Sequence, residues 1–460
     1  MSERHRRPYA NVIDMIGWTP LVRLNSVVDG CRTPVYGKCE FMNPGGSVKD
    51  RIGLAMIEAA ERDGRLKQGG TIVEGTSGNT GLALAMAAST RGYRCIFTMP
   101  DKMSQEKVKL LRAFGAEVII TPTAVPPDHP ENYVMKAKSI AAATPGAILA
   151  DQFYNDANPE AHYRSTGPEL WEQSEGRITH FFAGAGTGGT ITGTSRFLKE
   201  KNEDVRIVGV DPEGSMLGPY HRTGEKIEGH PYKVEGLGND KVPGALDLSL
   251  VDDYVTVSDR DSFLMARRLT REEGLFVGGS AGLIVHAAVE RAKELDDPDA
   301  FLVAVLCDWG EHYLSKCFDD EWMRENGYLP RPQRRTVREM MAERDAEGVI
   351  TVAPATSVRM ALSTITAHDI GQLPVVREGE CVGSVTEGDL MSRVIGDPEV
   401  LDHTVESVMD RPYPVLEGHV DAEEVTRLLQ RGNDACLVRE GGKLTGIVTR
   451  YDVVRALTSV

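Results

Sequence analysis

One stretch of the sequence decides the fold: Gly70-Thr-Ile-Val-Glu-Gly-Thr-Ser-Gly-Asn-Thr-Gly-Leu-Ala-Leu-Ala-Met-Ala-Ala88. It opens with a short apolar run beside glycine, which is typical of a buried strand, and closes with a longer run typical of a helix. Residues 94–99 and 104–114 repeat this order. Strands that alternate with helices in this way predict a parallel sheet and an α/β fold.

Three more apolar runs follow, at 180–184, 206–211 and 301–306, and each leads into a turn that contains glycine or aspartate. The alternation of strand and helix therefore extends to about Leu329. Ligands in open parallel sheets bind beyond the carboxyl ends of the strands. We expect the functional loops directly after these runs.

Three loops of small residues stand where such a site is expected. They are Asn43-Pro-Gly-Gly-Ser-Val-Lys-Asp-Arg51, Thr76-Ser-Gly-Asn-Thr80 and Gly186-Thr-Gly-Gly-Thr190. Lys49 in the first can form an imine with a carbonyl, and the other two offer backbone N–H groups and hydroxyls to anions. A lysine imine beside a phosphate cradle indicates pyridoxal phosphate.

Each loop also has a plainer interpretation on its own. Lys49 could be a solvated surface cation, and residues 186–190 could be an ordinary turn from strand to helix. Residues 76–80 could begin a helix, with Ser77 or Asn79 as the N-cap. The occurrence of all three loops in one chain favours the cofactor pocket.

The composition fits an enzyme that acts on small molecules. The 460 residues carry a net charge of −16, which argues against a nucleic-acid-binding surface. No apolar run has the length of a signal peptide or a membrane span, so we expect a soluble, cytoplasmic protein without a membrane partner. Seven scattered cysteines form no CxxC pair, so neither a metal site nor a disulfide framework is expected.

A second domain is predicted after a polar segment that contains two prolines and ends in Arg334-Arg335. We assign residues 1–329 to the catalytic domain and 330–335 to a linker. The sequence that follows contains a repeat, because Thr336-Val-Arg-Glu-Met-Met341 returns as Thr404-Val-Glu-Ser-Val-Met409. Two copies of one small α/β module, 336–396 and 404–460, are therefore expected.

The three loops together resemble those of the fold-type II pyridoxal phosphate enzymes of β-replacement, which include cystathionine β-synthases and cysteine synthases. Further stretches resemble the cystathionine β-synthases, and the repeat resembles their paired CBS domains. The resemblance covers nearly the whole chain. It implies an α/β catalytic domain of the tryptophan synthase β-like type with parallel sheets, followed by a tandem CBS (Bateman) module. The stretches in question are Lys102–Lys107, Asn158–Tyr163, Val210–Ser215 and Val234–Gly238.

The resemblance also implies a role for each matching residue. Lys49 would bind the cofactor as an imine and act as the base, and Asn79 would hydrogen-bond the hydroxyl of the cofactor ring. Ser280 would face the ring nitrogen, which favours elimination of a β leaving group over transamination. The remaining positions would bind the phosphate (Gly186, Thr187, Gly188, Gly189 and Thr190) or the substrate carboxylate (Thr76, Ser77, Gly78, Thr80 and Gln152).

The implied reaction is the condensation of L-serine with L-homocysteine to L-cystathionine and water, in transsulfuration toward cysteine. O-acetylserine sulfhydrylase activity is the close alternative, and a non-catalytic sensor of adenosine ligands is an alternative of another class. Phe153 stands where several relatives have tyrosine, and Asn239 replaces an aromatic residue, so inference about the second substrate is weaker. Animal members bind haem through an amino-terminal extension that this sequence lacks, so no haem is expected.

The paired CBS domains imply a site for an adenosine ligand such as S-adenosylmethionine. Thr386 and Asp389 in one copy, and Thr449 and Asp452 in the other, would contact phosphate or ribose. The alternative is a purely structural dimerisation module, because Thr and Asp also cap helices. The family further implies a homodimer, or a homotetramer built through the CBS domains.

Overall fold

The computed structural model describes residues 8–76, 78–126, 128–330, 336–342 and 348–458. The chain forms two compact units, Met1–Pro330 and Arg331–Val460. The linker predicted at 330–335 falls almost wholly outside the described residues, so the proposed domain boundaries stay a prediction.

A six-stranded sheet organises one half of the first unit. Its order is β1 (Leu21–Arg23), β2 (Val35–Cys39), β10 (Leu302–Leu306), β7 (His180–Gly184), β8 (Arg206–Pro212) and β9 (Asp253–Val257). Only β1 runs antiparallel, against β2. Helix α10 (Gly279–Leu295) packs on this sheet, where its apolar side chains join the larger hydrophobic core.

A second sheet of four parallel strands organises the other half. Its order is β5 (Glu117–Thr121), β4 (Arg94–Pro100), β3 (Thr71–Gly75) and β6 (Ala147–Leu149). The strands and helices predicted within residues 70–114 are confirmed as β3, α2 (Asn79–Arg91), β4 and α3 (Gln105–Ala113). Residues 80–88 of α2 are all buried, and most of them are alanine or leucine, so this helix is buried on nearly every side.

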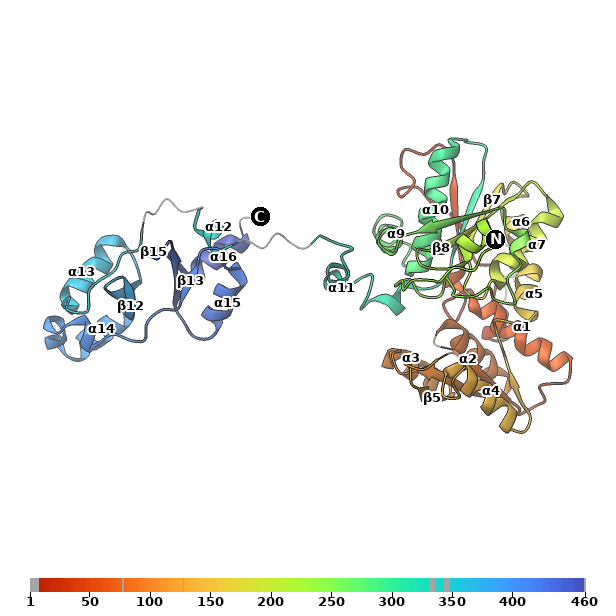
Figure 1. Ribbon diagram of the computed structural model, residues 1–460, viewed down its shortest axis with the longest axis horizontal. Helices are drawn as coiled ribbons and strands as arrows, with labels where there is room; N and C mark the ends of the chain where they lie inside the picture. The colour runs from red at the N-terminus through yellow and green to blue at the C-terminus, as the bar shows by residue number, and fades with distance from the viewer. Residues whose placement is uncertain (1–7, 77, 127, 331–335, 343–347, 459–460) are drawn as a thin grey trace. The chain divides into compact units, whose positions relative to one another are not determined.

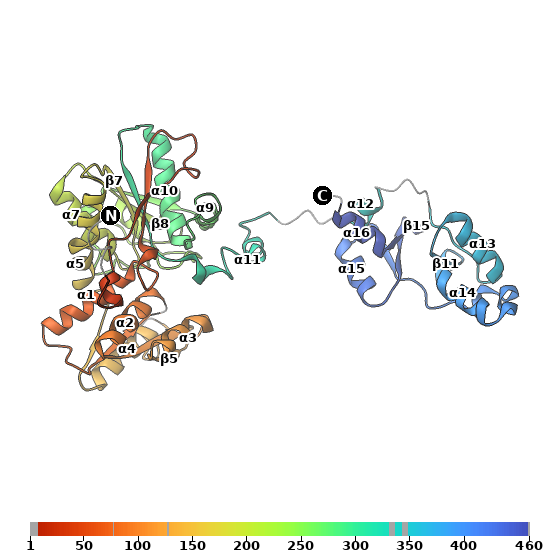
Figure 2. The ribbon, with the colours of Figure 1, turned by 180° about the vertical axis from the view of Figure 1, so that it is seen from behind.

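The two sheets form the cores of two lobes. Figures 1 and 2 show α2, α3, α4 (Tyr133–Ala143) and β5 together, apart from the group around β7 and β8. Helix α1 (Lys49–Arg62) packs against both α2 and α5 (Ala157–Arg164) and so joins the lobes. The other α-helices described in this unit are α6 (Thr166–Gln173), α7 (Gly189–Lys201), α8 (Leu217–Thr223), α9 (Asp259–Glu272) and α11 (Asp320–Glu325).

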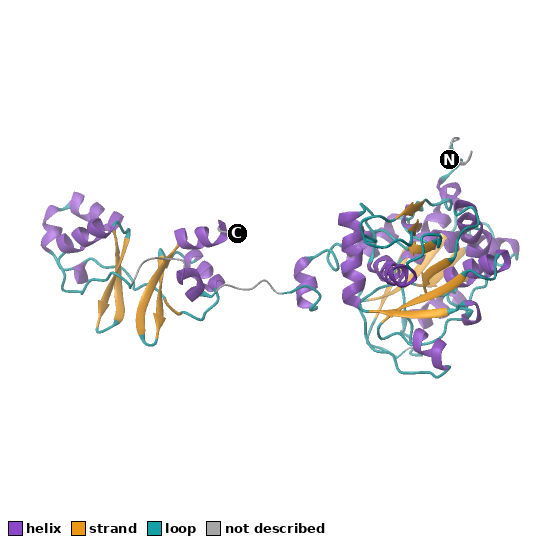
Figure 3. Ribbon diagram, turned by 90° about the horizontal axis from the view of Figure 1, so that it is seen from above, coloured by secondary structure: helices purple, strands orange, loops and turns teal. Residues whose placement is uncertain are grey.

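The second unit contains two sheets with helices beside them (Figure 3). One sheet is the hairpin β11 (Gln372–Arg377) and β12 (Glu380–Thr386), and the other holds β13 (Val415–Glu417), β14 (Ala435–Glu440) and β15 (Lys443–Thr449). The helices are α12 (Val337–Ala342), α13 (Val358–His368), α14 (Glu387–Gly396), α15 (Ala422–Gln430) and α16 (Arg450–Thr458).

The two copies of the repeat exchange their first segments. Val337, at the start of the first copy, donates its N–H to Val420 O at 2.9 Å and joins the core of the second copy. Val405, at the start of the second copy, donates to Thr356 O at 2.8 Å and joins the core of the first. Each copy therefore completes the hydrophobic core of the other.

Candidate active site

The three predicted loops meet at one place between the lobes of the first unit. A cavity of about 600 Å³ is lined by residues of all three loops. They are Lys49 of the first, Thr76, Gly78, Asn79 and Thr80 of the second, and Gly186 and Thr187 of the third. A smaller cavity adjoins it at Lys49 and continues along the third loop to Thr190. Two of the loops follow the carboxyl ends of strands, as expected, because β3 ends at Gly75 and β7 at Gly184. The first loop follows a short 3-10 helix, Glu40–Met42, after β2 and leads into α1.

Lys49 is half-buried and begins helix α1. The loop before it is held against the end of β10, because Val48 donates its N–H to Cys307 O at 2.9 Å and Trp309 donates to Gly46 O at 3.1 Å. Gly46 has φ +79°, a conformation that a side chain would strain. The Gly-Gly turn thus brings the lysine to the cavity.

A buried cluster of charges supports the first turn of α1. Arg51 pairs with Glu40 and Glu169, and Lys38 pairs with Glu169 at 2.8 Å. Burial alone would raise the pKa of Glu40, but Arg51 outweighs this effect and holds that pKa at about 2. Helix α1 is therefore fixed by ion pairs just beneath Lys49.

The third loop presents free backbone donors. The N–H groups of Gly186, Thr187, Gly188 and Thr190 have no acceptor within the described residues. Gly188 has φ +85° and is the N-cap of the 13-residue helix α7. Free N–H groups at the start of a helix attract an anion. Asn239 supports the loop from one side, because its Nδ2 donates to Gly186 O at 2.5 Å.

Helix α5 holds the same loop from behind. Asn158 Nδ2 donates to Thr187 Oγ1 at 2.9 Å, and His162 Nε2 lies 3.2 Å from Thr190 Oγ1. Burial, assisted by Arg51, lowers the pKa of His162 to about 3, so its ring is neutral. A Cβ on Gly189 would lie 1.8 Å from Asn158 Oδ1, so the helix can approach only glycine there.

Asn79 contacts a partner that the sequence did not suggest. Its Nδ2 donates to Asp308 Oδ2 at 2.8 Å, and Tyr313 donates its hydroxyl to the same oxygen at 2.7 Å. Burial raises the pKa of Asp308, although Tyr313 and Asn79 counter this effect. The N-cap of α2 is Gly78, so the plainer interpretation of Ser77 or Asn79 as a helix cap does not hold for Asn79. Ser77 lies outside the described residues.

Thr76, Thr80 and Gln152 all line the large cavity. Thr80 donates its hydroxyl to Gln152 Oε1 at 2.6 Å, which orients the amide. The backbone N–H groups of Asp151 and Gln152 are held by Glu74, at 2.8 and 3.4 Å. Burial raises the pKa of Glu74 to about 7. The predicted carboxylate loop and Gln152 are thus brought together.

Ser280 lies slightly apart from the other predicted residues. It is buried at the start of α10 and does not line either of these two cavities. Its hydroxyl contacts Cys307, which lines the smaller cavity together with Lys49. Burial raises the pKa of the Cys307 thiol to about 12, so this thiol is protonated and unreactive at neutral pH.

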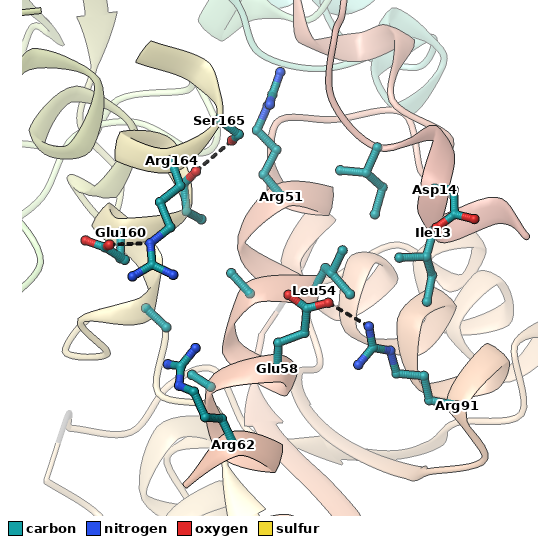
Figure 4. Close-up of a pocket in the computed structure, with 15 residues that line it drawn as sticks. Ile13, Asp14, Arg51, Leu54, Glu58, Arg62, Arg91, Glu160, Arg164 and Ser165 are labelled. Carbon is teal, nitrogen blue, oxygen red and sulfur yellow. Dashed lines mark hydrogen bonds and ion pairs between the residues drawn. The ribbon is translucent and has the colours of Figure 1, made fainter. Parts of the chain in front are cut away.

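A second groove, of about 360 Å³, lies between α1, α2 and α5 (Figure 4). It contains several arginines, but Arg91 pairs with Glu58 at 2.7 Å and Arg164 pairs with Glu160 at 2.5 Å. None of the predicted site residues lines it. The groove therefore offers no chemistry comparable to that around Lys49.

The predicted regulatory residues of the second unit bond to each other in pairs. Thr386 donates its hydroxyl to Asp389 Oδ2 at 2.5 Å and caps α14, and Thr449 donates to Asp452 Oδ2 at 2.8 Å before α16. For Thr386 the structure thus shows the helix cap on which the structural alternative for these residues was based. Their contact with a ligand stays a prediction.

Within the described ranges, no His, Cys, Asp and Glu side chains gather in groups of three or more that could hold a metal ion. No helix among these residues has both the length and the apolar character needed to cross a bilayer.

Comparison with known proteins identifies the family of this chain. The model of the pyridoxal-phosphate dependent enzymes matches residues 12–308, and the CBS domain model matches 337–396 and 405–459. This chain belongs to the pyridoxal-phosphate dependent enzyme family. It is 39% identical to a cystathionine beta-synthase of Dictyostelium discoideum, over 97% of this chain and 92% of the relative. The family prediction and the fold class are confirmed.

Two further relatives carry the names of two different enzymes. A cystathionine beta-synthase of Oryctolagus cuniculus is 38% identical over 98% of this chain and 85% of its own length. A cysteine synthase of Staphylococcus aureus (strain N315) is 44% identical, over 68% of this chain and 99% of its own length.

The cavity fits the cofactor that this family requires. Four backbone N–H groups that have no acceptor among the described residues, together with the dipole of α7, suit the phosphate. The smaller cavity runs from that loop to Lys49. A Cβ on Gly186 would lie 2.2 Å from Gly236 O, so the loop could not pack there with larger residues. The chain thus has an anion site and an amine along one cavity.

Several residues of this site were missed from the sequence. Asn158 and His162 belong to a stretch noted only for its resemblance to the family, and Asp308 was seen only as a turn residue. Nothing local marks them, because their partners lie far along the chain: Asp308 is 229 positions from Asn79.

Proposed function

We propose that this protein is a cystathionine β-synthase, which condenses L-serine with L-homocysteine to L-cystathionine and water. The carrying observation is the convergence of Lys49, the 76–80 loop and the 186–190 loop on one cavity. Relatives that carry this name and match nearly the whole chain, CBS repeat included, support the proposal.

Bound pyridoxal phosphate supplies an electron sink for the carbanion at Cα of the amino acid. Lys49 is proposed to hold the cofactor and then, as a free amine, to move the Cα proton. The β-hydroxyl of serine leaves with a proton as water, and the thiolate sulfur of homocysteine forms the new bond at Cβ. Gly186, Thr187, Gly188, Gly189 and Thr190 are proposed to hold the phosphate.

The substrate carboxylate is proposed to bind at Thr76, Ser77, Gly78 and Thr80, with Gln152 beside it. The bond from Thr80 to Gln152 supports this assignment because it leaves the amide N–H groups of Gln152 for the substrate. Asn79 is proposed to keep its role at the ring hydroxyl while Asp308 orients it. Ser280 is proposed at the ring nitrogen, where a neutral hydroxyl favours elimination.

The experiment is steady-state turnover of the cofactor-loaded full chain with serine plus homocysteine, compared with O-acetylserine plus sulfide. A higher kcat/KM for the first pair is expected. A preference for the second pair would instead make the protein an O-acetylserine sulfhydrylase fused to CBS domains, in keeping with its cysteine synthase relatives. Absence of turnover with both pairs would favour the third candidate, a non-catalytic sensor.

We further propose that an adenosine ligand such as S-adenosylmethionine binds the CBS repeat and regulates the enzyme. Thr386, Asp389, Thr449 and Asp452 are the proposed contacts, and their side chains lie at the starts of two helices. Calorimetry with S-adenosylmethionine, ATP and AMP tests this proposal. Lack of binding by all three would leave the repeat a structural module.

The remaining proposals concern assembly and place in the cell. We propose the domain limits 1–329, 330–335, 336–396 and 404–460, a homodimer or homotetramer, and a cytoplasmic role in transsulfuration. Sedimentation analysis of the full chain tests the assembly. Absence of haem is tested by the absorption spectrum of the purified protein, in which a Soret band would contradict it.

A further inference from the structure

Three charged side chains meet in the lining of the large cavity. Lys107 Nζ lies 2.8 Å from Glu235 Oε2, and Lys316 Nζ pairs with the other carboxylate oxygen, Oε1. Lys107 belongs to α3 beside the four-stranded sheet, whereas Glu235 and Lys316 follow β8 and β10 of the six-stranded sheet. We call these three residues the clasp, because they join the two lobes across the cavity.

The clasp stands out by charge. Among the described residues that line this cavity, Glu235 is the only carboxylate, and Lys102 and Lys233 add two further ammonium groups nearby. The whole chain carries a net charge of −16, so the cationic lining of this cavity is opposite in sign to the overall charge. Burial alone would raise the pKa of Glu235, but Lys107 and Lys316 outweigh this effect and lower it, so the carboxylate is ionised at neutral pH.

The proposed reaction brings a second amino acid into this cavity. The carboxylate of the first is assigned to the 76–80 loop. The second carries an ammonium and a carboxylate of its own, and charged groups enter a cavity at low cost only where opposite charges receive them. The clasp supplies one anion and two cations that face the same cavity. Inorganic sulfide has no such groups to bind.

We propose that the clasp binds the charged head of the thiol substrate, with its ammonium on Glu235 and its carboxylate on Lys107 and Lys316. The inference rests on the proposed function and specifies its second substrate as an amino-acid thiol. The clasp therefore selects homocysteine over small uncharged thiols. It also opens as the substrate enters, because the incoming charges replace its internal ion pairs.

The test compares thiols in the cofactor-loaded full chain with serine as the first substrate. In Glu235→Gln and Lys107→Met we expect KM for homocysteine to rise about tenfold, equivalent to about 1.4 kcal/mol. KM for 2-mercaptoethanol or sulfide, and KM for serine, should change less than twofold. Lys136→Met is the matched control, because Lys136 forms an exposed 2.8 Å pair with Glu131 on the same lobe. Its kinetics should equal those of the wild type.

Two results would overturn this inference and leave the proposed function intact. One is an equal rise in KM for all thiols in the variants, which a clasp that only holds the lobes together would cause. The other is an unchanged KM for every thiol. A wild-type enzyme that uses sulfide but not homocysteine would overturn the proposed function and the inference with it. Fluorescence of the four tryptophans, all of which lie before residue 330, checks that the catalytic unit of each variant is folded.

Discussion

Arg51 donates to both carboxylate oxygens of Glu169, with nitrogen–oxygen distances of 2.7 Å each. Both side chains are buried, at 2% and 4% exposed. Two parallel bonds of this kind fix orientation as well as distance. Because Arg51 follows Lys49 by two residues on α1, this pair sets the position of the proposed catalytic amine.

Arg51→Met is expected to destabilise the catalytic unit by about 3–5 kcal/mol, because it leaves Glu40 and Glu169 buried without their main partner. Urea unfolding followed by tryptophan fluorescence measures the change. Arg164→Met is the control, since Arg164 is 68% exposed and its i,i+4 pair with Glu160 contributes about 0.5 kcal/mol or less. Equal shifts in the two variants would contradict a structural role for the buried cluster.

Lys49→Ala is expected to keep the fold but lose covalent attachment of the cofactor, and turnover should fall at least about 10³-fold, the scale of losing a positioned base. Gel filtration of the variant after loading should remove the cofactor absorbance that the wild type retains. Turnover near the wild-type rate would refute the role proposed for Lys49. The tryptophan spectrum should not change.

Asn158→Ala is expected to raise the dissociation constant of pyridoxal phosphate about tenfold, the effect of losing roughly one hydrogen bond that orients the cradle. Thr187 would lose the donor that now lies 2.9 Å away. Equilibrium dialysis measures the affinity. Asn25→Ala serves as the control, because Asn25 is exposed and its side-chain Nδ2 donates to Arg23 O at 3.1 Å, outside the cradle. An affinity unchanged in Asn158→Ala would show that the loop is fixed without it.

His162 should make stability fall as the pH drops. Its pKa is about 3 in the folded chain, below the ordinary value of 6.5, so the unfolded chain binds the proton first. Between pH 7 and 5.5 this linkage removes about 1 kcal/mol of stability. Asp50 and Glu74 have pKa values raised to about 7, so their protonation adds stability as the pH falls. The contribution of His162 is therefore measured by comparing a His162 variant with the wild type.

His162→Gln should therefore lose about 1 kcal/mol less stability than the wild type on going from pH 7 to 5.5. Urea midpoints by tryptophan fluorescence at both pH values measure this difference. His129→Gln, at an exposed site, should behave as the wild type. If His162→Gln and the wild type respond alike, the histidine is not held neutral in the folded chain.

The sequence by itself determined the elements and the kind of chemistry. The run before Gly75 and the helix after Gly78 could be predicted because hydrophobic periodicity and glycine turns act over a few residues. The three loops predicted a pocket for pyridoxal phosphate because they combine a lysine with loops of small residues that can bind an anion, and each follows an apolar run or stands where a helix begins. The CBS repeat was visible because its two copies share local motifs.

Only the tertiary structure decided which distant residues meet. The pairing of Asn79 with Asp308, the support of Thr187 by Asn158, and the clasp of Glu235 with Lys107 and Lys316 each join separate elements. In the second unit, Val337 and Val405 pack into the core of the other copy. Such contacts depend on the order of strands in the sheets and on how the lobes pack together. Local sequence patterns predict neither of these.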